Sequence, residues 1–354
     1  MAEGQSRVEL LLARFAETGN LPHSLLFTGP EGSGKTLLAV EMAARINCDP
    51  GGGVPDGECP SCGKVRRFEH PDLHLVFPVP YGDWEKALPV VIESRREDFF
   101  AHGEFGSRAR SIGIDIIRGV IEAVSKHPFE GRKNVVVLFE AHLMTTEAQN
   151  AFLKLLEEPP PSALLVLVTE YPDRLLETVR SRCRRLRFDY LQPGLVQSFL
   201  ERFYSVESGE AKRISLLAEG NLRRGVRLLE EGFAGMRRVA SSIVRLVVDG
   251  KGKELIAEAE GLARGYGRED IVMLLDEVAV LLRLVMRSQS GIATDDERAL
   301  IGEMVGAGAV KRALKRDIPS DLRKIQGAAR NLSRNVDAEL TLSQLLLDLT
   351  GKWY

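Results

Sequence analysis

The sequence predicts an α/β fold in its first half and an all-helical second half. Three short stretches carry the apolar runs of buried strands: SLLFTGP at residues 24–30, NVVVLFE at 134–140 and ALLVLVTE at 163–170. Such runs are typical of parallel strands that are covered by helices on both faces. Segments with helical spacing lie between them, and strands that alternate with helices predict a parallel sheet. After Phe188 no strong strand pattern remains, so residues 189–354 are predicted to be helices joined by turns.

Composition limits the classes of protein. The chain has 354 residues, 44% hydrophobic and 28% charged, which is typical of a globular protein of about two or three domains. Its formal net charge of −2 predicts no overall basic surface, so contact with nucleic acid would need a local patch or partner proteins. No apolar run approaches the roughly 20 residues that span a bilayer, and the first ten residues lack the apolar core of a signal peptide. We therefore expect no membrane association and a cytoplasmic location.

Residues 7–18 have helical spacing, and a helix is predicted from Thr36 to Ile46. Strand character returns at residues 70–79, whereas residues 80–110 are charged and mixed, as expected of an insertion with some helix. A helix is predicted over residues 111–129.

The next predicted helix is capped by Thr145 or Thr146 and ends at EEPPP. In the helical half, residues 268–288 are apolar on most of the helix circumference, which indicates a buried bundle helix. A final helix with an apolar stripe is predicted over residues 336–350. We place domain boundaries near residues 189 and 236.

A complete phosphate-binding loop, GPEGSGKT, joins the first strand to its helix. Strand, GxxxxGK[ST] and helix together form the context in which this pattern marks a nucleotide site. Gly29, Gly32 and Gly34 let the backbone turn its N–H groups toward phosphate oxygens. Lys35 is expected to neutralise phosphate charge, and the hydroxyl of Thr36 to bind Mg²⁺. The alternative, a glycine turn with an incidental lysine, fits this context poorly.

The strand at residues 134–140 raises the question of hydrolysis. In phosphate-loop enzymes an acidic residue at the end of such a strand helps to hold Mg²⁺, and a neighbouring glutamate orients the attacking water. Glu140 can take the second role, but Phe139 has no oxygen to offer a hard cation. The alternative is a core strand in which Glu140 is incidental. The sequence predicts a site that binds nucleotide and cuts it rarely.

A basic run follows the predicted helix LLETVRSR. Arg182 lies in it, within the tripeptide SRC, and its planar cation is suited to a γ-phosphate. At a subunit edge such a residue completes a neighbour's site as an arginine finger. The alternative is a solvated basic run.

Three of the four cysteines, Cys48, Cys59 and Cys62, fall within fifteen residues in the Gly- and Pro-rich segment 48–64. In a cytosolic chain this clustering indicates a metal rather than a disulfide. Zn²⁺ takes four tetrahedral ligands, so the fourth would be Asp56, His70 or water. A loop without metal is the alternative.

Taken together, these stretches resemble the clamp-loader branch of the AAA+ ATPases, and within it the delta-prime type of subunit of bacterial DNA polymerase III. The resemblance rests on LPHSLLFTGPEGSGKT, on CPSC followed by HPDL, on EGRKNVVVLFEAHLMTTEAQNAFLKLLEEPP and on LLETVRSRCRRLRF. It is dense over residues 20–230 and weaker beyond, although RNVDAELTLSQLLLDL is similar to a last collar helix.

The resemblance implies three domains: an AAA+ nucleotide-binding domain over residues 1–188, a small helical lid over 189–235, and a helical collar over 236–354 that forms the oligomer. It also implies roles for two residues that the patterns above leave unassigned. Thr169 would sense the γ-phosphate, and Arg223, in GNLRRGV, would contact nucleotide from the lid.

Two positions depart from the family pattern. Asp56 stands where the family has a second cysteine, so the resemblance favours it as the fourth zinc ligand, with reduced affinity. Phe139 stands where motor subunits carry aspartate. The first hypothesis is therefore a stator subunit that binds ATP with Mg²⁺, hydrolyses it poorly and supplies Arg182 to a neighbour. Its partners would be the other subunits of a hetero-pentamer, and through them the sliding clamp and primed DNA.

Two alternatives stay open. One is an ATP-hydrolysing motor subunit of the gamma/tau type, which Phe139 disfavours. The other is an AAA+ remodeller outside replication, which the pair of LLEEPP and SRC disfavours.

Overall fold

The computed structural model describes residues 21–48, 59–80, 82, 84–100, 109–255, 265–306, 308–333 and 336–350. These residues form two compact units: one reaches Leu195 and includes Gly220–Arg223, and the other consists of Val196–Glu219 and the chain from Arg224 onward. The predicted boundaries near residues 189 and 236 stay a prediction. None of the described helices is long and apolar enough to cross a membrane. The helix predicted at residues 7–18 lies outside the described residues.

A five-stranded parallel sheet forms the centre of the first unit, in the order β2-β5-β6-β1-β7. The strands are β1 (Ser24–Thr28), β2 (Leu73–Val76), β5 (Asn134–Leu138), β6 (Ala163–Thr169) and β7 (Arg184–Arg187). Every residue of the three central strands is buried, as their apolar runs predict. The predicted parallel α/β sheet is confirmed. The sequence did not predict β7, because three of its four residues are exposed arginines on an edge strand.

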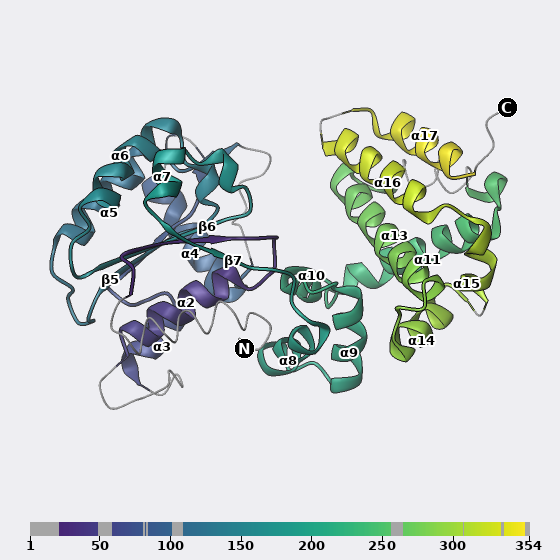
Figure 1. Ribbon diagram of the computed structural model, residues 1–354, viewed down its shortest axis with the longest axis horizontal. Helices are drawn as coiled ribbons and strands as arrows, with labels where there is room; N and C mark the ends of the chain where they lie inside the picture. Colours follow the sequence, from purple (N-terminus) through teal and green to yellow (C-terminus); the bar gives the residue numbers. More distant parts are fainter. Residues whose placement is uncertain are drawn as a thin grey trace. The chain divides into compact units, whose positions relative to one another are not determined.

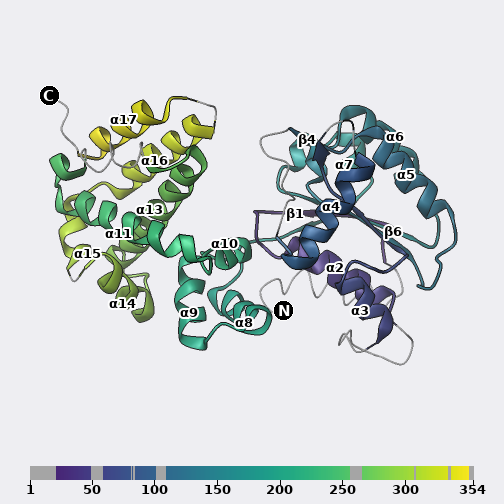
Figure 2. The same ribbon diagram turned by 180° about the vertical axis from the view of Figure 1, so that it is seen from behind.

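Helices cover both faces of this sheet (Figures 1 and 2). On one side lie α2 (Lys35–Ile46) and α3 (Pro60–Arg66), and on the other lie α5 (Ile114–Ser125) and α6 (Thr146–Glu157). Thr145 caps α6, as predicted, with its hydroxyl accepting a bond from a backbone N–H of the first turn.

The smaller elements of the first unit correct two predicted ranges. The predicted helix 111–129 begins only at Ile114, because Arg110–Ser111 form strand β4, which pairs with β3 (Val79–Pro80). The predicted strand 70–79 divides accordingly into β2 and β3. The predicted insertion contains a long helix, α4 (Trp84–Glu97), and α7 (Glu177–Ser181) leads into β7.

The second unit is helical throughout its described residues. Its long central helix is α13 (Arg268–Gln289), which is buried along most of its length, as predicted. Against it pack α11 (Glu231–Asp249), α14 (Asp295–Met304), α15 (Ala309–Arg312) and α16 (Ile318–Ser333). The remaining described helices after β7 are α8 (Pro193–Tyr204) and α10 (Leu222–Arg227), which begin in the first unit, and α9 (Ser208–Leu217) and α17 (Ala338–Thr350). The predicted helical second half is confirmed.

The sheet order brings the candidate site together. In the sheet, Leu167 of β6 pairs with Leu26 of β1 on one side and with Leu138 of β5 on the other. The segments that follow these three strands therefore leave the sheet side by side. The phosphate-binding loop follows the first strand, Thr169 ends the second and Phe139 follows the third. In parallel α/β sheets ligands bind outside the carboxyl ends of the strands, which is where these residues lie.

Candidate nucleotide site

The loop between β1 and α2 has the tight curl that its glycines predict. Gly29 has φ 148° and Gly32 has φ 68°, a region that other residues rarely adopt. A Cβ atom on Gly29 would collide with the backbone oxygen of Phe188, and one on Gly32 would collide with the side chain of Asn221. Both positions therefore require glycine for space as well as for conformation. Gly34 then caps α2, so the N-terminus of this helix faces the site.

Lys35 is almost completely buried, with 5% of its surface exposed. Its Nζ donates to the carbonyl oxygens of Gly29, at 2.8 Å, and Pro30, and to Oγ of Ser33 at 3.3 Å. Burial lowers the pKa of Lys35 to about 8, and the nearby carboxylate of Glu170 opposes part of that shift. The ammonium group is thus charged at neutral pH, poorly solvated and bonded to weak acceptors that a phosphate can replace.

Phe139 occupies the strand end where hydrolysing sites carry a carboxylate. The residue is 2% exposed, and its ring stacks on that of Phe77 with centroids 4.3 Å apart and planes 3° from parallel. The guanidinium of Arg95, from α4, lies 4.8 Å from the Phe77 centroid and 5.5 Å from the Phe139 centroid. This contact is a cation–π arrangement on an aromatic pair. A cation thus stands at the position where the carboxylate would bind one.

Glu140 follows in a left-handed conformation, with φ 47° and ψ 45°. Such a conformation is costly for a residue other than glycine, and it is typical of functional sites. Its carboxylate forms a long ion pair with Arg110, with Nη2 and Oε2 4.0 Å apart. The predicted water-orienting role of Glu140 stays a prediction.

The end of β6 presents a hydroxyl and a carboxylate to the site. The hydroxyl of Thr169 is 3.0 Å from Nδ1 of His142 and accepts a bond from the backbone N–H of Tyr171 at 3.1 Å. Burial raises the pKa of the neighbouring Glu170 to about 6, with the negative charge of Glu31 adding to the shift and Lys35 opposing it. Thr169 is therefore held in a fixed position that faces the loop, and its predicted sensing role stays a prediction.

Arg223 reaches the site from the segment Gly220–Arg223, which packs on the loop through a bond from Leu222 N–H to the Gly32 oxygen at 2.9 Å. The guanidinium of Arg223 forms an ion pair with the carboxylate of Glu31. Arg223 lines the same cavity as Lys35, and its predicted contact with nucleotide stays a prediction.

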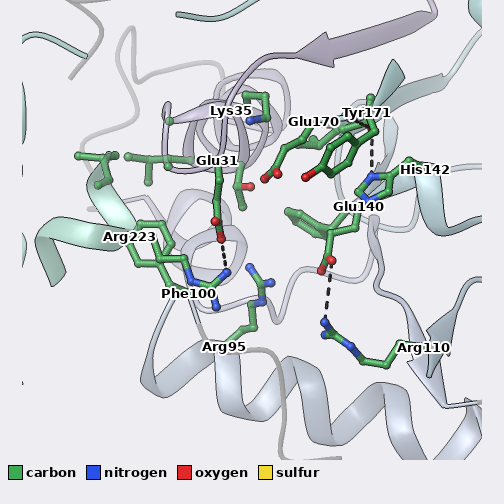
Figure 3. Close-up of a pocket in the computed structure, with 18 residues that line it drawn as sticks. Glu31, Lys35, Arg95, Phe100, Arg110, Glu140, His142, Glu170, Tyr171 and Arg223 are labelled. Atoms are coloured by element: carbon green, nitrogen blue, oxygen red, sulfur yellow. Dashed lines mark hydrogen bonds and ion pairs between the residues drawn. The ribbon is translucent and has the colours of Figure 1, made fainter. Parts of the chain in front are cut away.

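These groups line a cavity of about 270 Å³ (Figure 3). Of the predicted residues, those lining it are Gly32, Gly34, Lys35, Thr36, Glu140, Thr169 and Arg223. The sequence did not predict the other charged or polar lining residues, which are Glu31, Arg95, Arg110, His142, Glu170 and Tyr171. For Glu170 its place directly after Thr169 was an available signal, whereas Arg95 and Arg110 belong to a segment without a motif.

The predicted finger, Arg182, is not among the residues that line this cavity. It follows α7, and about a third of its side chain is exposed. Its Nη2 is 2.7 Å from a carboxylate oxygen of Glu157, in the LLEEPP stretch, and its Nη1 donates to the Thr178 carbonyl oxygen. Glu157 therefore holds a partly exposed cation at the surface of the first unit, where another chain can reach it.

The predicted Mg²⁺ site has its loop hydroxyl but lacks a carboxylate at the strand end. Thr36 faces the cavity, but the strand end offers an aromatic ring, and a guanidinium lies over it. Among the described His, Cys, Asp and Glu residues, no group of three acidic side chains brings its oxygens within 4.8 Å of one another. Mg²⁺ in nucleotide sites usually keeps several waters and takes one or two protein oxygens with the phosphates, so the Thr36 hydroxyl stays available to it without help from the strand end.

A second candidate metal site is formed by the cysteines of the segment that precedes and includes α3. The sulfur atoms of Cys48, Cys59 and Cys62 lie within 4.8 Å of one another. The amide N–H of Cys62 donates to the sulfur of Cys59 at 3.2 Å. Three converging thiols fit a soft ion such as Zn²⁺. Asp56, the predicted fourth ligand, lies outside the described residues.

His70, the other protein candidate for the fourth ligand, is engaged elsewhere. Its Nε2 is 3.1 Å from the Ser61 hydroxyl, and its Nδ1 accepts the backbone N–H of Asp72 at 3.1 Å. The histidine therefore has a structural role at the start of β2.

A family model described as "DNA polymerase III, delta subunit" matches residues 4–192, which is more than half of the chain. The chain belongs to this family. The predicted membership of the polymerase III clamp-loader proteins is thereby confirmed. The family match covers the described sheet, the phosphate-binding loop, the aromatic strand end and the SRC arginine.

Relatives of the polymerase III family differ in type. DNA polymerase III subunit delta' of Bacillus subtilis is 34% identical over 200 residues, which cover 56% of this chain and 52% of that protein. DNA polymerase III subunit tau of Salmonella typhimurium is 27% identical over 340 residues, which cover 89% of this chain and 47% of that protein. The chain spans about half the length of these relatives. A solved gamma subunit-related protein of Thermotoga maritima is 19% identical, with a TM-score of 0.49 and coverage of 96% of this chain and 98% of that one.

Proposed function

We propose that this polymerase III subunit acts as a clamp-loader stator of the delta-prime type. It holds a nucleotide, hydrolyses it poorly, and supplies Arg182 to a neighbouring ATPase subunit while the complex loads the sliding clamp onto primed DNA. The observation that carries the proposal is the buried ring of Phe139 at the strand end, stacked on Phe77. Without an oxygen there, the site lacks an interaction that commonly stabilises transition-state charge by several kcal/mol.

An ATPase assay of the isolated chain tests the weak hydrolysis. We expect a rate near background, and we expect ATP to bind with an affinity that Lys35→Ala reduces because the buried ammonium group is lost. A substantial rate that Lys35→Ala abolishes would overturn the proposal. That result would favour the second candidate, a hydrolysing gamma/tau-type subunit, which the match to subunit tau over 89% of the chain supports.

Reconstitution with the other loader subunits tests Arg182. Arg182→Ala should leave the nucleotide affinity of this chain unchanged, since its side chain lies outside the cavity. It should lower the ATPase rate of the complex by about 10³-fold at the site that the finger completes. Arg187→Ala is the matched control, because Arg187 is a nearby and largely exposed arginine. Equal rates for the two variants would refute the finger role.

We also propose that Cys48, Cys59 and Cys62 bind Zn²⁺, with Asp56 as fourth ligand. The convergence of the three thiols supports this proposal. Metal analysis of the purified chain should find one Zn²⁺ per molecule, lost in Cys62→Ser and bound more weakly in Asp56→Ala. A wild-type chain without zinc after purification from zinc-supplemented cells would contradict it.

A further inference from the structure

Arg95 is a buried cation that forms no ion pair with any carboxylate in the described part of the chain. It is 7% exposed, its Nη1 donates to the carbonyl oxygen of Phe99 at 3.0 Å, and its Nε has no hydrogen-bond partner. Among the described residues no carboxylate lies within ion-pair distance of its guanidinium. Burial lowers the pKa of Arg95 to about 10, with the charge of Glu140 opposing the shift, so the group stays charged at neutral pH. A buried charge without a counter-ion is unfavourable, and such a group is expected to have a partner in its working state.

The carboxylates of the cavity already face other cations. Glu31 pairs with Arg223, Glu140 pairs with Arg110, and Glu170 faces the ammonium group of Lys35. Figure 3 shows Arg95 pointing into the cavity among these groups, opposite Lys35. Among the described cations of the cavity, Arg110 and Arg223 form ion pairs with carboxylates, whereas Lys35 and Arg95 form none within 4.0 Å and can receive an anion.

The aromatic pair determines where Arg95 stands. The guanidinium of Arg95 packs beside the stacked rings of Phe77 and Phe139, nearer to Phe77. A planar guanidinium binds two phosphate oxygens at once, and this geometry suits adjacent phosphoryl groups better than a point charge does. The position is close to that of the missing strand-end carboxylate, hence to the place where a hydrolysing site keeps its metal ion.

We propose that Arg95 replaces the divalent cation of this site, so that the chain binds the polyphosphate of a nucleotide without Mg²⁺. The inference rests on the proposed nucleotide-binding function and specifies its chemistry. The polyphosphate lies between Lys35 on the loop and Arg95 on α4, and Phe139 holds Arg95 in place. Such an arrangement neutralises charge in the bound state without aligning a metal for hydrolysis.

Calorimetric titration of the full-length chain with ATP tests this inference. The titration is done in buffer with Mg²⁺ and in buffer freed of Mg²⁺ by dialysis rather than by a chelator, which would also remove zinc from the cysteines. The dissociation constants in the two buffers should agree within about threefold, since the guanidinium supplies the charge. Arg95→Met, which keeps the length and apolar stem, should weaken binding without Mg²⁺ by about tenfold or more.

Two variants serve as controls. Arg96→Met removes the next cation of α4, which is paired with Glu93, and should leave binding unchanged. Arg95→Lys keeps the charge but not the fork, and should lie between wild type and Arg95→Met. Thermal melts of each variant show whether the fold is kept, and if Arg95→Met does not fold, the wild-type comparison and Arg95→Lys decide.

The outcomes separate the inference from the function on which it rests. Failure of wild type to bind ATP in either buffer would overturn both. Binding that is tight with Mg²⁺ and at least about tenfold weaker without it would overturn the inference and leave the nucleotide-binding function standing. If ATP binds equally well in both buffers and Arg95→Met does not weaken that binding, the role of Arg95 is refuted while binding without Mg²⁺ still stands.

Discussion

The pKa of Lys35 makes nucleotide binding depend on pH between about pH 7 and pH 9. Burial lowers this pKa to about 8, and a bound phosphate favours the charged ammonium group. The protonated fraction of the free chain falls from about nine tenths at pH 7 to about one tenth at pH 9. If only the charged form binds phosphate well, the dissociation constant of ADP rises about tenfold over this range, or roughly 1.3 kcal/mol.

The contribution of Lys35 to the stability of the free chain should move in the opposite direction. Between about pH 8 and the ordinary lysine value of 10.5, the unfolded chain binds a proton at Lys35 that the folded chain has released. The free energy of unfolding therefore rises with pH in that window, by on the order of 3 kcal/mol from this group. Weaker binding combined with higher stability is a signature that general alkaline damage does not produce.

Calorimetry in buffers of different ionisation enthalpy measures the affinity and the proton uptake on binding together. Lys35→Arg keeps a permanent charge and should bind ADP with a flat profile between pH 7 and pH 9, because arginine does not titrate there. Lys35→Met should bind weakly at every pH and lose the alkaline rise in stability. The reasoning is refuted by a wild-type affinity that is flat over this range, or by ADP binding without proton uptake at pH 9.

Three further predictions concern the scaffold. Gly29→Ala should lower the free energy of unfolding, measured in denaturant, by at least about 2 kcal/mol because the added Cβ collides with backbone. Gly113→Ala is the control: Gly113 has φ −79° and open space around it, so the change should cost less than about 1 kcal/mol. Asp72→Asn should lower the free energy of unfolding by about 3 kcal/mol, because the Asp72 carboxylate accepts three backbone N–H bonds from residues 129–131. Burial alone would raise the pKa of Asp72, but these three bonds lower it. The stabilisation from these bonds is complete above the ordinary pKa of aspartate and is lost as pH falls through the lowered pKa of Asp72 in the folded chain. The stabilities of wild type and variant should therefore converge in acid. Thr145→Ala should cost about 1 kcal/mol in thermal melts through the lost cap of α6.

The sequence predicts the parts of the fold that depend on local pattern. The three central strands are continuous apolar runs because helices cover both faces of the sheet, and the structure buries all of their residues. The edge strand β7 escapes prediction for the same physical reason. An edge has few buried positions, so the sequence RRLR presents charge rather than an apolar run.

In the candidate site, too, some residues could be predicted from the sequence and others could not. The residues of the phosphate-binding loop are predicted because their spacing along the chain is itself the geometry of the loop. Arg95 is 60 residues beyond Lys35 and reaches the cavity only because α4 packs where β5 ends. Nothing in the spacing of the chain encodes that contact. The phenylalanine at position 139, where a carboxylate is expected, could be read from the sequence, but its contact with Arg95 could not.

Compared with a hydrolysing site, Phe139 and Arg95 are best understood as one joint difference rather than two separate ones. With a carboxylate at the strand end, Arg95 would form a buried ion pair with it and block that carboxylate from a metal. With the aromatic ring, the guanidinium packs beside the Phe77–Phe139 pair and keeps most of its hydrogen-bond donors for another anion. It follows that Phe139→Asp alone should not restore hydrolysis, because the new carboxylate would pair with Arg95. Only the double change, Phe139→Asp with Arg95→Met, should make ATP binding stronger with Mg²⁺ than without it.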